Sequence, residues 1–185
     1  HPGRVALLSR VKKEGIGGAY VAGFDSALQS DAALIAQMDA DLSHDPNDLP
    51  RLVAAIEHAD LVLGSRYVEG GNTAGWPCHR KFISRVGGRY ARTVLRVPIQ
   101  DLTGGFKVYR RNALEALDID HITSDGYVFQ IETTYKTILN GFRVVEIPIH
   151  FIDRVAGKSK LSRRIVLEAT FVVWKLKLER LLGRI

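Results

Sequence analysis

Short apolar runs alternate along the chain with longer stretches in which apolar residues recur at helical spacing. The short runs predict buried strands and the longer stretches predict helices. This alternation predicts an α/β fold with a mainly parallel sheet, in which ligands bind at the carboxyl ends of strands. The predicted strands are residues 5–9, 33–38, 60–64, 105–109 and 144–149, and the predicted helices are residues 19–29, 45–57, 80–95, 111–117, 126–139 and 162–182.

Glycine, proline and asparagine mark the ends of several of these elements. Asp45 and Pro46 suit the N-cap and first turn of a helix, whereas Asn140 followed by Gly141 is a standard helix stop. Residues 15–18 predict a glycine-rich turn, and residues 67–77, which combine glycines with a proline, predict a mobile loop. The chemically active motifs are therefore expected just after the predicted strands.

The helical pattern at residues 162–182 is interrupted by charges. Its longest uncharged stretch, residues 169–174, has six residues, whereas a membrane span needs about 20. Apolar residues flanked by Lys and Arg suit a helix lying in the plane of a membrane surface, and packing on the protein core is the alternative. We therefore expect a catalytic domain over residues 1–150 and a basic amphipathic membrane-interface segment over residues 151–185.

The composition is that of a globular domain, but its charge is uneven. Of 185 residues, 46% are hydrophobic and 25% are charged, with a net charge of +6. From Asn140 onward there are ten Lys or Arg and four acids, so the excess points this end toward an anionic partner. Nucleic acid is not expected, because interleaved aromatic residues and a binding motif are lacking. The lone Cys78 indicates a reducing compartment or a tolerated thiol.

Two aspartates follow the predicted strand 33–38 directly. Asp39 and Asp41, in the segment QMDADLSHDP, lie two positions apart, so both carboxylates can reach one side of a turn. Oxygen ligands of this kind hold Mg²⁺ or Mn²⁺ and leave positions open for phosphate oxygens. The pattern predicts a metal that neutralises a departing nucleotide diphosphate. The alternative is that Asp39 forms a turn and Asp41 is an ordinary surface residue.

The segment KEGIGG and several cations offer weaker signals. The glycines lack the spacing of a P-loop or a dinucleotide fingerprint, so they indicate either close approach to a nucleotide or sugar, or an ordinary turn. Most exposed cations are solvated surface charges, but Arg66 directly follows a buried strand, and its fork suits bidentate phosphate binding. The other cations after predicted strands or loops are Arg80, Arg154, Lys158 and Lys160.

Eight segments, in order, resemble those of the dolichyl-phosphate mannose synthases, inverting members of glycosyltransferase family 2. The resemblance covers nearly the whole chain and implies a GT-A type, Rossmann-like nucleotide-sugar domain. Family members begin with a strand and a Pro-x-x-x-Glu-type segment that helps bind the base, and nothing here matches it, so we expect N-terminal strands to be missing. The segments are residues 15–24, 37–46, 64–67, 76–84, 101–111, 124–132, 145–149 and 151–161.

The resemblance implies transfer of mannose from GDP-mannose to a polyprenyl or dolichyl phosphate in a single inverting displacement. A phosphate monoester has a second pKa of about 6, so this acceptor needs cations to position it more than a base to activate it. The implied residues are Asp41, Arg66 and Arg80 for catalysis; Asp39, Asp41 and Ser43 for the metal; Gly15, Gly17, Asp39, Ala40, Asp41 and Gln130 for the donor; and Arg66, Arg80, Ser84, Arg154 and Lys160 for the acceptor phosphate.

Four further residues are assessed from their own chemistry. Asp101 and Glu132 resemble family segments near the sugar, but by themselves they indicate a turn cap and a solvated helix residue. The mechanism does not need His44 or His79, and both are expected to be surface or loop histidines.

Two other functions stay open from the sequence. One is the same chemistry with UDP-glucose or another donor, and the other is a non-catalytic membrane-binding module. The expected location is the cytoplasmic face of a membrane, with an anchoring subunit or domain as a further partner.

Overall fold

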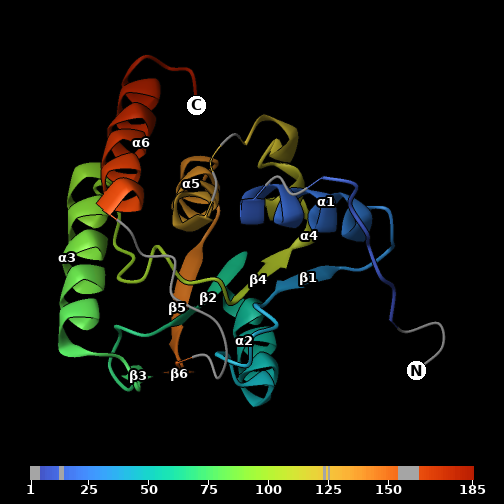
Figure 1. The fold of residues 1–185 in the computed structure, drawn as a ribbon. Coiled ribbons are helices and arrows are strands. Elements are labelled where there is room, and N and C mark those ends of the chain that lie inside the picture. Colours follow the sequence, from blue (N-terminus) through green and yellow to red (C-terminus); the bar gives the residue numbers. More distant parts are fainter. Residues whose placement is uncertain (1–4, 13–14, 123, 125, 154–162) are drawn as a thin grey trace.

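A computed structural model of the chain describes residues 5–12, 15–122, 124, 126–153 and 163–185, without the side chains of residues 120 and 163–168. Its centre is a four-stranded sheet, and two short strands pair separately beside it (Figure 1). In spatial order the main sheet contains β1 (Leu34–Gln37), β4 (Lys107–Arg110), β2 (Leu61–Ser65) and β5 (Val144–Pro148), and the small sheet contains β3 (Asn72–Ala74) and β6 (His150–Ile152).

The strand directions confirm the α/β fold and add one reversed strand. β2 and β5 are parallel, whereas β4 is antiparallel to both of its neighbours, β1 and β2. β1, β2 and β5 therefore run in one direction. β4 is reversed because it begins at the carboxyl end of β2, where Lys107 pairs with Leu63, and then runs back along that strand.

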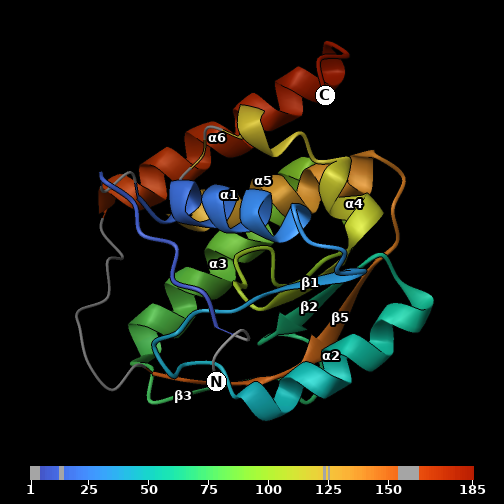
Figure 2. The same ribbon diagram turned by 90° about the vertical axis from the view of Figure 1, so that its right-hand side faces the viewer.

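Helices cover both faces of the main sheet (Figures 1 and 2). Helices α1, α4 and α5 lie on one face and α2 lies on the other, while α3 and α6 pack side by side at one end. Their bounds are α1 Gly15–Leu28, α2 Leu49–Ala55, α3 Cys78–Leu95, α4 Arg111–Glu115, α5 Gly126–Leu139 and α6 Arg163–Leu181, and 3₁₀ turns occupy Pro46–Asp48, Ile56–His58 and Ile119–His121.

The central strand β2 is buried on both faces. Leu61 and Leu63 join the larger hydrophobic cluster, which contains residues of α1, α3, α5 and α6. Val62 joins the smaller cluster under α2, together with Val108 of β4. A strand that is covered on both faces is apolar at every position, which explains why this segment was predicted from a continuous run rather than from alternation.

Most predicted elements are present, with small shifts at their ends, but three predictions are wrong. Residues 5–9 form no strand: none of the described residues pairs with them, and Leu7 is 93% exposed. Residues 15–18 are the first turn of α1 rather than a separate turn. The predicted loop 67–77 contains β3, which pairs with the equally unpredicted β6. Strands of three residues are too short to show the alternation of apolar and polar residues that predicts a strand.

Helix α6 packs on the core along one side, which was the alternative considered for it, and contact of its exposed side with a membrane stays a prediction. Val173 and Leu176 are buried in the larger cluster, so one side packs on the core. Phe171, Trp174 and Leu178 are more than half exposed on the other side. No helix among the described residues is long and apolar enough to cross a bilayer.

Candidate functional site

Three of the predicted site residues, Asp39, Arg66 and Arg80, gather where the carboxyl ends of β1 and β2 meet the loop before β4. Asp39 lies two residues after β1, and Arg66 follows β2 directly. This arrangement agrees with the rule that ligands of α/β sheets bind beyond the strand ends. One cavity there is lined by Asp39, His44, Gly64, Arg66, Trp76, Arg80, Thr103, Gly104, Gly105, Tyr127, Ile149 and Phe151.

The Asp39 carboxylate is held on two sides. The hydroxyl of Tyr20, on α1, donates a hydrogen bond to Asp39 Oδ1. On the other side, a Cβ atom added to Gly105 would lie 3.3 Å from Asp39 Oδ2, so the carboxylate rests close to a bare backbone. Burial and the adjacent carboxylate raise the pKa of Tyr20, which keeps its proton available for this bond. Sequence reasoning missed Tyr20, because its partner lies 19 residues away.

A tight turn brings Ser43 back onto Asp41. Leu42 has a left-handed backbone with φ of 63°, and both the backbone N and the Oγ of Ser43 donate to Asp41 Oδ1, at 3.1 and 2.5 Å. Carboxylate and hydroxyl oxygens at Asp39, Asp41 and Ser43 are the hard ligands that suit Mg²⁺ or Mn²⁺. The described residues contain no cluster of three or more His, Cys, Asp or Glu side chains that could hold a metal by themselves. A metal held by these oxygens would need further ligands, which substrate oxygens would supply.

Arg66 and Asp101 form a buried ion pair. Arg66 donates from Nε to Oδ2 at 2.7 Å and from Nη2 to Oδ1 at 2.6 Å, and its backbone N donates to Oδ2 at 3.0 Å. Thr103 Oγ1 accepts a further bond from Nη2 at 2.8 Å. Burial alone would raise the pKa of Asp101, but the charge and hydrogen bonds of Arg66 outweigh it and hold the pKa below its ordinary value. Asp101 also accepts a hydrogen bond from Thr103 Oγ1 in the following turn, at 3.3 Å, in keeping with the predicted turn cap, but the prediction missed that Asp101 fixes the Arg66 guanidinium.

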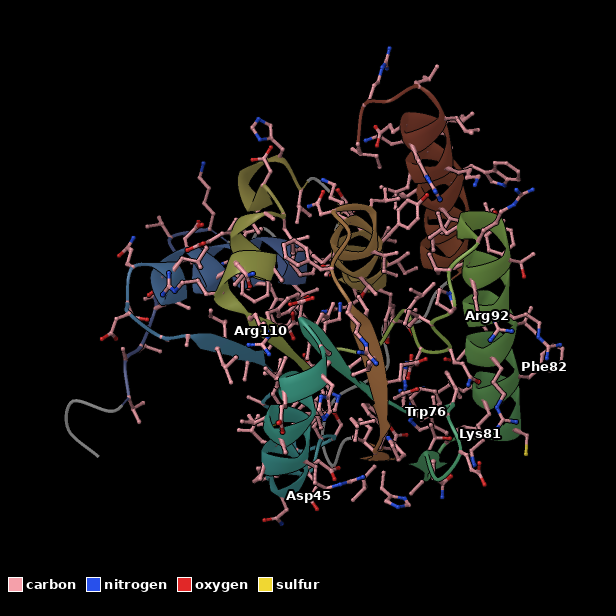
Figure 3. The ribbon with its side chains drawn as sticks, turned by 180° about the vertical axis from the view of Figure 1, so that it is seen from behind. Asp45, Trp76, Lys81, Phe82, Arg92 and Arg110 are labelled. Carbon is pink, nitrogen blue, oxygen red and sulfur yellow. The ribbon has the colours of Figure 1, made fainter. Side chains whose placement is uncertain are left out.

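Trp76 lies between two cations. The Arg80 guanidinium is 4.0 Å from the centre of the indole ring and that of Arg66 is 5.4 Å from it, both within cation–π range. Arg80 also donates to Asp153 Oδ1 at 2.8 Å. Trp76 precedes α3 and lies on the side of that helix that faces the sheet, whereas Phe82, within α3, extends outward (Figure 3). Trp76 thus contacts both arginines, and all three residues line the cavity.

A second cavity begins at the same cations and extends between the helices. It is lined at its polar part by Arg66, Arg80 and Ser84, and Tyr67 donates its hydroxyl to Ser84 Oγ at 2.6 Å. The structure thus brings together three of the five residues predicted to contact the acceptor phosphate. Arg154 and Lys160, like Lys158, lie outside the described residues. Trp76 and Thr103 also line it, and the rest of the lining is mostly apolar and comes from α3, α5 and α6, including Ile83, Ala91, Ile131, Ala169 and Val173.

His44 lies in a loop, which is one of the two predicted alternatives, but it is buried rather than on the surface. Its side chain is 5% exposed and lies against Phe106 and Phe151, with ring centres 5.3 and 5.1 Å away. Burial lowers the pKa of His44, against the opposing effect of the Asp39 charge. The turn at Asp41–Ser43 directs the imidazole inward, and the backbone N of Ile152 donates to the Ser43 carbonyl, which fixes this segment to β6. His79 is exposed, as predicted.

Gln130 is part of a buried hydrogen-bond network behind the cavity. Its Oε1 accepts from Gln37 Nε2 at 2.9 Å, and the same nitrogen donates to the Gly105 carbonyl at 3.0 Å. Lys107 Nζ donates to the Gln130 carbonyl and to Thr133 Oγ1 at 2.9 and 3.0 Å. Burial holds the pKa of Lys107 well below its ordinary value. Gln130 thus supports the loop that carries Gly105.

The other predicted residues occupy varied positions. Gly15 and Gly17 lie in the first turn of α1, the helix that carries Tyr20, and Ala40 is exposed between the two aspartates. Glu132 is buried and pairs with Lys136 at 2.8 Å, so the prediction of a solvated side chain is wrong.

Comparisons with known proteins agree with this picture. Residues 1–118 match the Glycosyl transferase family 2 model. The chain is 47% identical over 165 residues to an undecaprenyl-phosphate mannosyltransferase of Micrococcus luteus, covering 89% of this chain and 68% of the relative. It is 46% identical over 173 residues to a polyprenol monophosphomannose synthase of Mycolicibacterium smegmatis, covering 93% and 65%. The chain thus spans about two thirds of the length of these relatives, whose names agree with the resemblance drawn from the sequence.

Solved structures support the GT-A fold. A glucosyl-3-phosphoglycerate synthase of Mycobacterium tuberculosis, solved with Mn²⁺, UDP and phosphoglyceric acid, has a TM-score of 0.62 at 16% identity, covering 91% of this chain and 55% of that one. The same enzyme with Mn²⁺ and UDP-glucose has a TM-score of 0.60 at 16% identity, covering 92% and 55%. At this identity the likeness concerns the fold alone.

Proposed function

The chain belongs to glycosyltransferase family 2, and on that basis we propose that it transfers mannose from GDP-mannose to a polyprenyl phosphate and releases GDP. The printed names of the two relatives support the mannosyl group and the polyprenyl phosphate acceptor. The proposed displacement is direct and inverts the anomeric carbon.

The observation that carries this proposal is the joining of two unlike surfaces in one cavity. Arg66 and Arg80 lie at one part of it, and apolar residues of α3, α5 and α6 line most of the rest. A phosphate attached to a long hydrocarbon needs both surfaces: cations for its head and an apolar wall for its first isoprene units. A sugar acceptor would find few hydrogen-bonding groups along this wall.

The donor side of the site is adjacent. Arg66 and Arg80 line both cavities, so a phosphate held by them would lie beside the cavity that contains Asp39. A divalent metal at Asp39, Asp41 and Ser43 would supply charge neutralisation for the departing diphosphate. The Mn²⁺ in the similar solved structures supports a divalent ion without identifying it for this chain.

The acceptor chemistry requires little from the protein besides placement. The second pKa of a phosphate monoester is about 6, so near neutral pH the acceptor already carries a nucleophilic oxyanion. Arg66 is held by Asp101, and Arg80 by Asp153 and Trp76, so neither cation has to be ordered when the phosphate binds. Such preorganisation is the main contribution that positioned charges make to a transfer reaction.

The enzyme is proposed to act at a membrane surface. Exposed apolar side chains on α6, Phe171, Trp174 and Leu178, share that helix with Lys175 and Lys177. Aromatic residues and cations on one helix are typical of interfacial binding. The apolar cavity between α3 and α6 would then take the acceptor from the same surface.

The test is transfer of radiolabelled mannose from GDP-mannose to a polyprenyl phosphate by the full-length protein, with Mg²⁺ or Mn²⁺ and then with a chelator. Metal-dependent labelling of the lipid is the expected result, and Asp39→Ala with Asp41→Ala should abolish it. Labelling from UDP-glucose alone would keep the reaction class and replace the donor. Absence of transfer from every nucleotide sugar tested would favour a non-catalytic membrane-binding module.

A further inference from the structure

Two residues that line the site each carry a buried polar atom with no hydrogen-bond partner among the described residues. Within the described residues, neither Nδ1 of His44 nor Nε1 of Trp76 makes a hydrogen bond, although both atoms are shielded from solvent. Both residues line the cavity that contains Asp39. Buried polar groups are nearly always paired in native proteins, so an unpaired one at a binding site indicates a ligand.

The surroundings of His44 limit what it can contact. Phe106 and Phe151 pack against the imidazole and offer it no hydrogen-bond partner, and Ile149 lines the same cavity. Trp76 reaches the cavity from the side of Arg80 and also packs edge-on against Phe151, with ring centres 5.4 Å apart. The two unpaired nitrogens therefore belong to side chains that meet the same phenylalanine.

The position of this cavity fits the group that is transferred. Asp39 lies at one part of the lining, and Arg66 and Arg80 lie at another. If the nucleotide diphosphate is held at Asp39 and the acceptor phosphate at the arginines, the sugar must lie between them, because it passes from one to the other. His44 and Trp76 line this same cavity.

The hydrogen-bonding chemistry also fits a sugar. A neutral imidazole has one donor nitrogen and one acceptor nitrogen, and an indole has one donor. A hydroxyl can both donate and accept, whereas an ionised phosphate only accepts. A wall that offers donors and an acceptor in apolar surroundings therefore suits hydroxyl groups better than a second phosphate.

We propose that His44 and Trp76 hydrogen-bond the hydroxyl groups of the transferred sugar and so contribute to the choice of donor. This inference rests on the proposed function. It assigns to two residues a role that neither the metal motif nor the phosphate-binding cations perform.

The test compares His44→Phe and Trp76→Phe with the unmodified full-length protein. Phenylalanine keeps a ring in each position and removes the nitrogen, and His79→Phe provides the same change at an exposed histidine. The substrates are GDP-mannose and its four monodeoxy derivatives. The unmodified protein should lose about tenfold in kcat/KM on the derivative that lacks the contacted hydroxyl, the typical effect of one hydrogen bond.

Each variant should lose the ability to distinguish GDP-mannose from one of its derivatives, rather than lose the same factor in kcat/KM on all five substrates. On GDP-mannose, the kcat/KM of His44→Phe should be about tenfold lower than that of the unmodified protein. On the derivative that lacks the hydroxyl contacted by His44, the variant and the unmodified protein should have the same kcat/KM. Trp76→Phe should behave likewise with a different derivative, and His79→Phe should match the unmodified protein. By calorimetry with Mg²⁺, both variants should bind GDP normally and GDP-mannose more weakly.

Two outcomes would overturn the inference. One is that both variants keep the ratios of kcat/KM that the unmodified protein shows among the five substrates. The other is that the variants bind GDP and GDP-mannose more weakly by the same factor, which would indicate a structural role. If the unmodified protein transfers no sugar, the proposed function fails separately, and the calorimetric comparison of GDP with GDP-mannose still decides whether these residues contact the sugar.

Discussion

Replacing Asp101 with asparagine would test how the site holds its central cation. The carboxylate of Asp101 is fully buried and accepts three hydrogen bonds from Arg66, whose side chain is only 5% exposed. Asparagine has nearly the same shape but carries no charge. The substitution therefore leaves the Arg66 guanidinium buried without its counter-charge while changing the packing little.

The expected cost follows from this burial. Removing one partner of a buried ion pair destabilises a protein by about 3–5 kcal/mol, because the remaining charge is uncompensated. For a chain of this length, each kcal/mol lowers the melting temperature by about 2–4 °C, so the melting temperature should fall by roughly 6–20 °C. The matched control is Asp48→Asn, which breaks an Arg–Asp pair of similar distance, 2.5 Å, in which the Arg51 side chain is 50% exposed. An exposed pair contributes about 0–1 kcal/mol.

The assay is urea unfolding of both variants at pH 7, followed by a pH series. The depressed pKa of Asp101 means that its stabilisation is complete above the unfolded-state carboxyl pKa of about 3.9 and is lost as the pH falls through the lower folded-state value. The difference between Asp101→Asn and the unmodified protein should therefore shrink in acid. Arg66→Met combined with Asp101→Leu should regain most of the stability without regaining transfer, since apolar replacements of buried pairs are often neutral.

A loss below about 1 kcal/mol for Asp101→Asn, equal to that of Asp48→Asn, would refute the reasoning. It would mean that Arg66 is solvated or paired elsewhere, and that Asp101 does not prepare it for a phosphate.

Three further predictions concern the metal, pH and membrane binding. Gly105→Ala places a Cβ atom 3.3 Å from Asp39 Oδ2 and should weaken Mn²⁺ binding in a titration. The control is Gly23→Ala, whose Cβ atom would meet nothing within 4 Å and should leave the affinity unchanged. Equal Mn²⁺ affinities of the two variants would contradict this role of Gly105. Burial lowers the pKa of Lys107, so between that pKa and about 10.4 the unfolded chain binds more protons and stability should rise with pH. The free energy of unfolding of Lys107→Met, measured with urea, should lack this rise. The same dependence on pH in the variant and the unmodified protein would contradict the prediction. Trp174→Ser should reduce sedimentation with anionic vesicles several-fold if the exposed indole enters the interface, and unchanged sedimentation would remove α6 from membrane contact.

The fold could be predicted from the sequence because its signals are local. The apolar run at 60–64 and the helical spacing at 126–139 each report burial through neighbouring positions, and both elements are present as β2 and α5. The same local reading failed for residues 5–9, because an apolar run becomes a strand only when another strand pairs with it. It also missed β3 and β6, whose pairing joins segments far apart in the chain.

The candidate site shows the same division. Asp39 and Asp41 were found because they are neighbours in sequence and follow a strand. The pairing of Asp101 with Arg66 was missed because Arg66 is 35 positions away, and a lone aspartate does not indicate what it pairs with. The burial of His44 was missed because it depends on Phe106 and Phe151, neither of which is near it in the chain.

The sequence by itself thus determined the α/β class, the position of the acidic motif after a strand and the cations that resemble phosphate ligands. Only the tertiary structure decided which of these groups meet. It joined Tyr20 to Asp39 and Arg66 to Asp101, placed His44 and Trp76 in one cavity, and set an apolar wall beside the arginines. The physical reason is that backbone periodicity is set by residues a few positions apart, whereas burial, pairing and charge compensation depend on contacts between distant segments.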